Sequence, residues 1–380
     1  MIRRIFYLGL FLLMPMTFSS LLTDFASGQN NQGVPTFRIS VRQLMIPIAV
    51  LKDGKMVSDL KKENIRIWLG TEKNGKTEWQ EREIKNFIPY EERSIATFVL
   101  VDSSGSVSLV LEQQKAAADN FLVSLLRQTK KRGSVLDYGA IGLFWHYHQR
   151  LNILMPLGQE PIIKPREGQS VVILKGEISK LKINNEEKEI QQFGIYIIEQ
   201  FKYNQDWTSD ISKLKNGLVS ISDAGGATNL YDALVWMAGK FDEFQPDATK
   251  VAVVITDGCD TISSHNFNFT INKLLDSQVM VFFVSVTDRE RICQETIEDI
   301  AKQTGGEWFQ ELNPSKLDAS FRKIIDQIRG VYSVSLEEPE GAGKHLIKVE
   351  IGENEKNGKW KREKGYTIHH PKQITTAKNP

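Results

Sequence analysis

The stretch FVLVDSSGSVS, residues 98–108, decides the fold of this 380-residue chain. Its first four residues are apolar, which is typical of a strand that is buried on both faces. The strand stops at the carboxylate of Asp102, and serines and a glycine follow at once. A buried strand that ends in so many oxygen atoms raises the question of what Asp102, Ser104 and Ser106 hold.

Segments beyond this stretch alternate between strand and helix. Apolar strands are expected at 96–102, 140–147, 251–257 and 279–286, with helices between them. The last helix, 315–329, carries an apolar stripe and ends at Gly330. Strands that alternate with helices predict a Rossmann-like α/β domain over residues 95–330, with a doubly wound, mostly parallel sheet.

Two regions that flank this domain have a different pattern. Residues 33–94 and 331–371 contain short alternating segments separated by polar turns, which predicts antiparallel strands. Neither region alone is comfortably large enough for a two-sheet core. We therefore expect the two regions to complete one β-sandwich with the α/β domain inserted into it; two separate β units are the alternative. We interpret residues 149–194 as an insertion with β character of its own. Residues 372–380 are expected to form a disordered tail.

The composition and the first residues indicate an exported globular protein. The apolar fraction of 41% can fill a sizeable core, and a formal net charge of +1 gives no support to a nucleic-acid partner. Residues 1–28 contain Arg3 and Arg4, an apolar segment and then the small residues Ala26 and Gly28, which predicts a secretory signal peptide. We expect a secreted, periplasmic or extracellular protein, attached to a membrane only if this segment is retained.

Oxygen side chains from three parts of the α/β domain are expected to meet at one edge of its sheet. Asp102 and Asp257 each end an apolar strand, and the carboxyl ends of such strands form the binding crevice of α/β folds. Thr228 precedes a helix that opens on the same edge. Together with Ser104 and Ser106, these side chains offer hard oxygen ligands and neither imidazole nor thiolate. This donor set suits Mg²⁺ first, then Mn²⁺ or Ca²⁺, rather than zinc.

The same residues resemble a known motif. DSSGS at 102–106, Thr228 in GGATNLYDAL and Asp257 in TDGCDT are similar to the metal-ion-dependent adhesion site (MIDAS) of von Willebrand factor A (VWA) domains. The flanking β regions, and the closing pattern REKGY at 362–366, resemble the bacterial secreted "VWFA-related" family. The resemblance implies that Asp102, Ser104 and Ser106 line the metal, that Thr228 and Asp257 coordinate it directly or through water, and that an Asp or Glu of a partner protein fills the open position.

The chain has two cysteines, Cys259 and Cys293. They follow neighbouring strands of the expected sheet, at the edge that carries the metal site. Export from the cell would permit a disulfide between them. The sequence leaves open whether the two are bridged.

Three enzymatic sites can be tested against the same residues. An aspartyl-phosphate site would need a second Asp at position 104, which is Ser. The serine-hydrolase motif G-x-S-x-G would need Gly at position 102, and the dinucleotide motif G-x-G-x-x-G is missing after the strand. We therefore expect no catalysis and no small-molecule substrate. The prediction is a metal-dependent adhesion or interaction module; a structural subunit whose metal only stabilises loops and, less favoured, a metal-dependent hydrolase are the alternatives.

Overall fold

The computed structural model describes most of the chain from Gln43 onward. The described ranges are 43–126, 135–165, 169–183, 186–221, 225–244, 246–285, 291–311, 313, 316–339, 343–355 and 358–376. These residues belong to one compact unit, Val41–Pro380. The predicted signal peptide, 1–28, and the start of the N-terminal β region, 33–42, lie outside the described residues.

Strand β6 (Ser94–Asp102) lies inside a seven-stranded mixed sheet, in the order β12-β11-β10-β6-β7-β9-β8. The first five strands of this order run parallel, and β9 and β8 run antiparallel to their neighbours. The other strands are β7 (Tyr138–Pro156), β8 (Gln169–Ile183), β9 (Glu186–Thr208), β10 (Ala248–Thr256), β11 (Met280–Ser285) and β12 (Trp308–Gln310).

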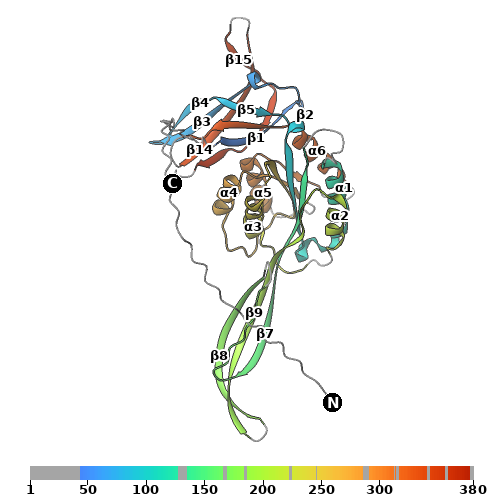
Figure 1. Ribbon diagram of the computed structural model, residues 1–380, viewed down its shortest axis with the longest axis vertical. Coiled ribbons are helices and arrows are strands. Elements are labelled where there is room, and N and C mark those ends of the chain that lie inside the picture. Colours follow the sequence, from blue (N-terminus) through green and yellow to red (C-terminus); the bar gives the residue numbers. More distant parts are fainter. Residues whose placement is uncertain are drawn as a thin grey trace, which may run out of the picture. The chain divides into compact units, whose positions relative to one another are not determined.

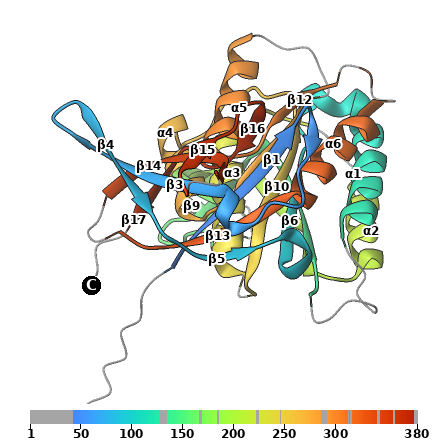
Figure 2. The same cartoon turned by 90° about the horizontal axis from the view of Figure 1, so that it is seen from above.

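Helices cover both faces of this sheet (Figures 1 and 2). Because side chains alternate along a strand, Val99 and Val101 of β6 enter one core, while Phe98 and Leu100 enter another. The first core includes side chains of α1 (Leu111–Leu125), α2 (Ile211–Val219) and α6 (Leu317–Arg329). The second includes side chains of α3 (Leu230–Glu243), α4 (Phe267–Asp276) and α5 (Arg291–Thr304). Among the described residues, no helix has the length and apolarity needed to cross a membrane.

Two five-stranded antiparallel sheets are built from the two ends of the chain. One has the order β16-β1-β13-β5 with β2 beside β1, and the other β15-β14-β3-β4 with β17 beside β14. Apolar side chains of β1, β3, β13 and β14 form one shared core. The strands are β1 (Gln43–Lys52), β2 (Lys55–Met56), β3 (Ile65–Lys73), β4 (Lys76–Arg82), β5 (Ile84–Ile88), β13 (Val331–Glu337), β14 (Gly343–Asn354), β15 (Trp360–Arg362), β16 (Tyr366–His369) and β17 (Gln373–Thr376). Short 3₁₀ turns occupy Lys62–Asn64, Tyr90–Glu92 and Gly105–Val110.

The end of the chain corrects one prediction. Residues 372–380 were expected to be disordered, but Gln373–Thr376 form β17, which pairs antiparallel with β14. The physical reason is burial, because Ile374 enters the core shared by the two antiparallel sheets. Residues 377–380 lie outside the described residues.

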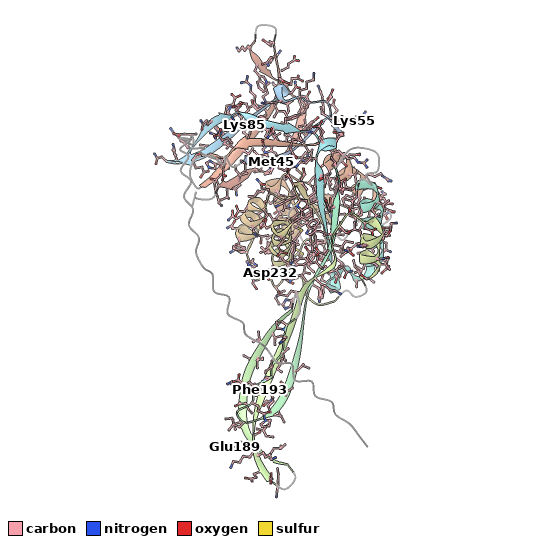
Figure 3. The ribbon with its side chains drawn as sticks, in the orientation of Figure 1. Met45, Lys55, Lys85, Glu189, Phe193 and Asp232 are labelled. Carbon is pink, nitrogen blue, oxygen red and sulfur yellow. A yellow bond between two sulfur atoms is a disulfide. The ribbon has the colours of Figure 1, made fainter. Side chains whose placement is uncertain are left out.

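The stretch 149–194, expected to be an insertion with β character, is occupied by parts of three long strands. β7 pairs with β6 only over Tyr138–Phe144 and then continues to Pro156 paired with β9 alone. β8 pairs with the same half of β9. The three strands leave the helix-covered part of the sheet together, with Phe193 midway and Glu189 near their far end (Figures 1 and 3). We call residues 147–199 the arm.

Candidate metal centre

Asp102, the last residue of β6, is a buried carboxylate held by neutral donors. Its side chain is 0% exposed. The backbone N–H of Ser104 donates to Oδ1 at 2.9 Å, and the hydroxyl of Thr256 donates to Oδ2 at 2.7 Å. Thr256 ends β10, the strand beside β6, and its Oγ1 also accepts from the N–H of Gly258 at 3.1 Å. The carboxylate therefore has a fixed orientation at the carboxyl edge of the sheet.

The serines that follow Asp102 form a short hydroxyl pair. Ser104 Oγ and Ser106 Oγ lie 3.1 Å apart. Ser104 is buried, whereas Ser106 is exposed. The residue between them is Gly105, which begins a 3₁₀ turn that leads into α1. This side of the cluster is consequently open to solvent, as a binding site requires.

The loop that carries Thr228 is tied to the serine loop by backbone hydrogen bonds. Gly225 N–H donates to Ser103 O at 2.7 Å, and Gly105 N–H donates to Gly226 O at 3.2 Å. Gly226 has φ +74°, a conformation that side chains other than glycine rarely adopt. Glycine at position 226 therefore permits the backbone conformation that presents its carbonyl to Gly105.

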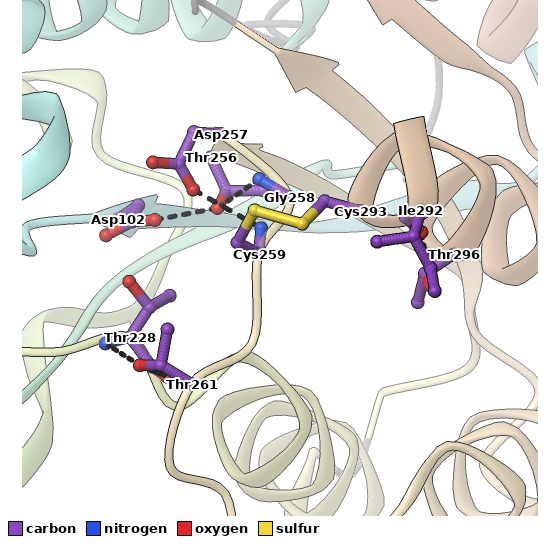
Figure 4. Close-up of a disulfide and its surroundings, with 10 residues drawn as sticks. All are labelled: Asp102, Thr228, Thr256, Asp257, Gly258, Cys259, Thr261, Ile292, Cys293 and Thr296. Carbon is purple, nitrogen blue, oxygen red and sulfur yellow. Dashed lines mark hydrogen bonds between the residues drawn. A yellow bond between two sulfur atoms is a disulfide. The ribbon is translucent and has the colours of Figure 1, made fainter. Parts of the chain in front are cut away.

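Thr228 is in turn joined to the loop that follows Asp257. The hydroxyl of Thr261 accepts from Thr228 N–H and donates to Thr228 O, both at 2.9 Å. The N–H of Thr261 also donates to Thr228 O at 2.8 Å. Figure 4 shows this clasp beside Asp102, Thr256 and Asp257. Hydrogen bonds thus join the three loops that carry the five predicted ligands. The serine loop is bonded to the Thr228 loop between Ser103 and Gly225, and the Thr228 loop to the Asp257 loop between Thr228 and Thr261.

A disulfide anchors the loop that carries Asp257. Cys259 and Cys293 are bonded, and they connect the loop after β10 to α5 (Figure 4). Asp257 is 1% exposed, and its Oδ1 accepts from Cys259 N–H at 3.3 Å. Gly258, between them, has φ +89° and lies against Ile297. The sequence left this bond open; the structure contains it.

The electrostatics of the cluster favour a cation. The pKa of Asp102 is raised to about 6, chiefly because the buried carboxylate loses hydration. Hydrogen bonds from Ser104 and Thr256 lower this pKa, and the negative charge of Asp257 raises it. No cationic side chain is among the groups that shift this pKa. Two buried carboxylates and several hydroxyls, with no positive partner for Asp102 in the part of the chain that the structure describes, fit a hard divalent cation.

This donor set differs from the usual clusters of acidic, histidine and cysteine ligands. Among the described residues, no group of three or more His, Cys, Asp or Glu side chains is placed to hold a metal ion. The predicted site contains two carboxylates, and the remaining donors are the hydroxyls of Ser104, Ser106 and Thr228. Its fit to a divalent cation consequently depends on hydroxyl oxygens as well as on the two carboxylates.

The raised pKa of Asp102 predicts a pH-dependent metal affinity. A cation binds the ionised carboxylate, so protons compete with it below the folded pKa of about 6. We expect Mg²⁺ affinity to be nearly constant above about pH 7 and to fall about tenfold by about pH 5. In the metal-free protein, the fold disfavours the ionised form of Asp102. The contribution of Asp102 to the free energy of unfolding therefore falls as pH rises from about 4 to about 6, whereas that of a salt-bridged Asp would rise. Calorimetric Mg²⁺ titrations across this range measure the first effect, and a flat affinity would contradict it.

Some residues of this cluster could not be singled out from the sequence. Thr256 directly precedes the predicted ligand Asp257, and Thr261 lies further along the same loop, but their roles come from partners 154 and 33 residues away. Asn229 is 0% exposed and both atoms of its side-chain amide lack a hydrogen-bond partner in the structure. Asp232 and Asp260, by contrast, accept backbone N–H groups of the neighbouring loops and helix and act structurally. Thr256 directly precedes Asp257 at the end of an apolar strand, and this position is the one sequence feature that could have indicated its role as a hydrogen-bond donor at the site.

Comparison with known proteins gives similar structures but no sequence family. No protein-family model matches the chain, and no curated protein is significantly similar to it. Proximal thread matrix protein 1 from the mussel byssus is 14% identical, with a TM-score of 0.42, over 62% of this chain and 48% of that one; a structure of it has a zinc-occupied MIDAS motif. This chain therefore spans about half the length of the mussel protein.

Two bacterial structures are also similar. A von Willebrand factor type A structure from Catenulispora acidiphila is 12% identical, with a TM-score of 0.40, over 89% of this chain and 75% of that one. BatB from Bacteroides thetaiotaomicron is 14% identical, with a TM-score of 0.35, over 60% of this chain and 97% of that one. The chain is similar to von Willebrand factor type A structures, and at these identities and TM-scores the role of its site has to be argued from its own geometry.

Proposed function

We propose that this chain is an exported protein-binding module of the VWA type that recognises a partner through a divalent cation. The observation that carries the proposal is the junction of three loops around Asp102, a buried carboxylate with a raised pKa and no cationic neighbour among the groups that shift it. A fold gains nothing in stability from such a carboxylate unless a bound ion compensates its charge. The resemblance of DSSGS, Thr228 and Asp257 to a MIDAS supports the same reading.

Each of the five residues has a role in this proposal. Asp102, Ser104 and Ser106 would hold the cation, with Thr228 and Asp257 as direct or water-mediated ligands. Mg²⁺ is the first candidate, followed by Mn²⁺ or Ca²⁺. When bound, the cation offers a coordination position that accepts a carboxylate, so the partner is a protein that presents an Asp or Glu. The exposed Ser106 marks the side from which the partner approaches.

The architecture we propose has two parts. Residues 95–330 form the VWA domain, with a doubly wound, mostly parallel sheet, and residues 33–94 and 331–371 form one β-sandwich. Two facts support the sandwich. β1 pairs with β13, although the whole α/β domain separates these strands along the chain. Apolar side chains from both antiparallel sheets share one core. The α/β domain is then an insertion between strands of that sandwich.

Export is part of the proposal for two reasons. The sequence of residues 1–28 has the pattern of a signal peptide. The bond between Cys259 and Cys293 suits an oxidising compartment outside the cytosol. No histidine lies among the matched motif residues to act as a base for their hydroxyls, which favours binding over catalysis.

The proposal is tested in two steps with the mature full chain. Calorimetric titration should detect binding of Mg²⁺ and Mn²⁺ at millimolar concentrations or below. Immobilised protein should then capture a partner from the surface of the native cell in Mg²⁺ and release it in EDTA. If metal raises only the melting temperature and EDTA has no effect on capture, the metal has a structural role; if no metal binds, both readings are wrong.

A further inference from the structure

The arm begins at the candidate metal centre. Phe144, which lies opposite Asp102 in the β6–β7 pairing, accepts from Ser103 N–H at 3.0 Å. Two residues further along β7, His146 forms a two-bond bridge with Ala227, the neighbour of Thr228: His146 N–H donates at 2.8 Å, and Ala227 N–H donates back at 2.9 Å. The strand therefore passes directly beside two of the loops that carry the predicted ligands, and then continues into the arm (Figure 1).

Beyond His146, one edge of β7 has no strand partner among the described residues. Strand β6 occupies this edge as far as Phe144, and Ala227 occupies it at His146. From Tyr147 to Pro156 the pairing of β7 is with β9, residue by residue and on the other side. An added strand on this free edge would lie along β7 in the direction in which β6 would continue beyond Asp102. A segment added there would have one end at the metal centre.

The direction of individual backbone groups follows from a hydrogen bond at the far end of the β7–β9 pairing. Alternate residues of a strand present their N–H and C=O to the same side. Leu157, just past the end of β7, donates its N–H to Glu189 O at 3.0 Å and so faces β9. Since no register shift interrupts the pairing from Tyr147 to Pro156, the even-numbered residues Asn152 and Leu154 present their N–H and C=O to the free side. Unpaired groups of this kind are a template for another strand.

The side chains of the arm suit an apolar partner. Among the described residues, nine of the seventeen large apolar side chains that are exposed lie on the arm. Two of them, Leu151 and Leu154 (58% exposed), are on β7 itself, and five are on β8. On β9, by contrast, Phe193 and Ile195 are buried. Such a concentration of exposed apolar surface on paired strands indicates a binding surface. The free edge of β8 is the other candidate, but β8 lies on the far side of β9 from β7 and from the metal centre.

We propose that the partner binds as an added β-strand on the free edge of β7, Tyr147–Pro156, and that the acidic residue at its end nearest the sheet reaches the cation. The ligand is therefore an extended segment with alternating apolar side chains and a terminal or near-terminal Asp or Glu. This inference rests on the proposed function. Backbone hydrogen bonds give such a complex affinity, and the carboxylate fixes its register.

The test uses the mature full chain loaded with Mn²⁺ and two synthetic peptides, KTVTVTVGD and DGVTVTVTK, which place the acidic residue at either end of a strand. Asn152→Pro removes one N–H from the free edge, where proline is tolerated, and Asn152→Ala is the matched control that keeps this N–H. We expect Asn152→Pro to weaken binding of the better peptide about tenfold and Asn152→Ala to leave it within about twofold. Both variants should bind Mn²⁺ as the wild type does, and bound Mn²⁺ should broaden the aspartate signals of the peptide.

The outcomes separate the inference from the proposed function. If Mn²⁺ does not bind the wild type, the proposed function fails and the inference fails with it. If Mn²⁺ binds but neither peptide does, or Asn152→Pro binds the peptide as tightly as Asn152→Ala, the added strand is wrong while the metal site stands. If light scattering finds a dimer without peptide that Asn152→Pro dissociates, a second copy of the chain occupies the edge and the proposal of a foreign strand is overturned.

Discussion

Asp102→Asn is expected to weaken Mg²⁺ and Mn²⁺ binding at least about a hundredfold. Asn has nearly the same shape and can still accept one of the hydrogen bonds from Ser104 and Thr256, but it carries no charge to attract the ion. We expect metal to raise the melting temperature of the wild type and to leave that of the variant unchanged. Calorimetric titration and thermal unfolding with and without metal measure the two effects.

The same substitution should stabilise the metal-free protein at neutral pH. The shift of the Asp102 pKa to about 6 corresponds to roughly 3 kcal/mol by which the fold disfavours the ionised carboxylate. Asp276→Asn is a suitable control, because it makes the same chemical change on an exposed residue at the end of α4. A variant at Asp102 that binds metal as tightly as this control would remove Asp102 from the ligand set.

The part of the site that could be predicted is the part encoded locally. An apolar run that stops at an acidic residue predicts a strand end, and parallel strands bring such ends to one edge. This reasoning placed Asp102 and Asp257 at neighbouring strand ends, as β6 and β10 do in the structure. It could not find Thr256 as a donor to Asp102, because that hydrogen bond depends on the register between two strands 154 residues apart.

The less predictable parts of the fold depend on long-range pairing. Alternating side chains predicted strands at both ends of the chain, and the small size of each end favoured one shared sandwich, but the pattern could not tell which strands pair: β1 with β13 and β3 with β14, across the intervening α/β domain. The final strand β17 was missed because it has four residues, and its order comes from burying Ile374 against the shared core. Local propensity says little about so short a segment.

The arm shows a similar limit. Its sequence has strand-like alternation, so β character was predictable for residues 149–194. Nothing in that pattern tells whether the strands form a separate unit or extend the main sheet. In the structure the arm extends the main sheet, since β7 is one continuous strand from Tyr138 to Pro156. That continuity is what brings a free strand edge to the candidate metal centre.

The double variant Cys259→Ser/Cys293→Ser is expected to lower the free energy of unfolding by about 3–4 kcal/mol. The bond closes a sequence separation of 34 residues, and removing it restores conformational entropy to the unfolded chain. The variant should also bind Mg²⁺ several-fold more weakly, because the loop that positions Asp257 between β10 and α5 loses its covalent anchor. Urea unfolding and calorimetric titration measure the two effects.

Wild-type protein treated with a reductant is the matched control, since it keeps both cysteines and lacks only the bond. It should unfold at the same urea concentration as the double variant and share its weaker Mg²⁺ affinity. If the variant loses stability but keeps the metal affinity of the oxidised protein, the hydrogen bonds that join Thr228 to Thr261 hold the Asp257 loop by themselves. If both losses occur together, the disulfide stabilises the metal site as well as the fold. Reduction would then lower the affinity for the partner along with the affinity for the metal.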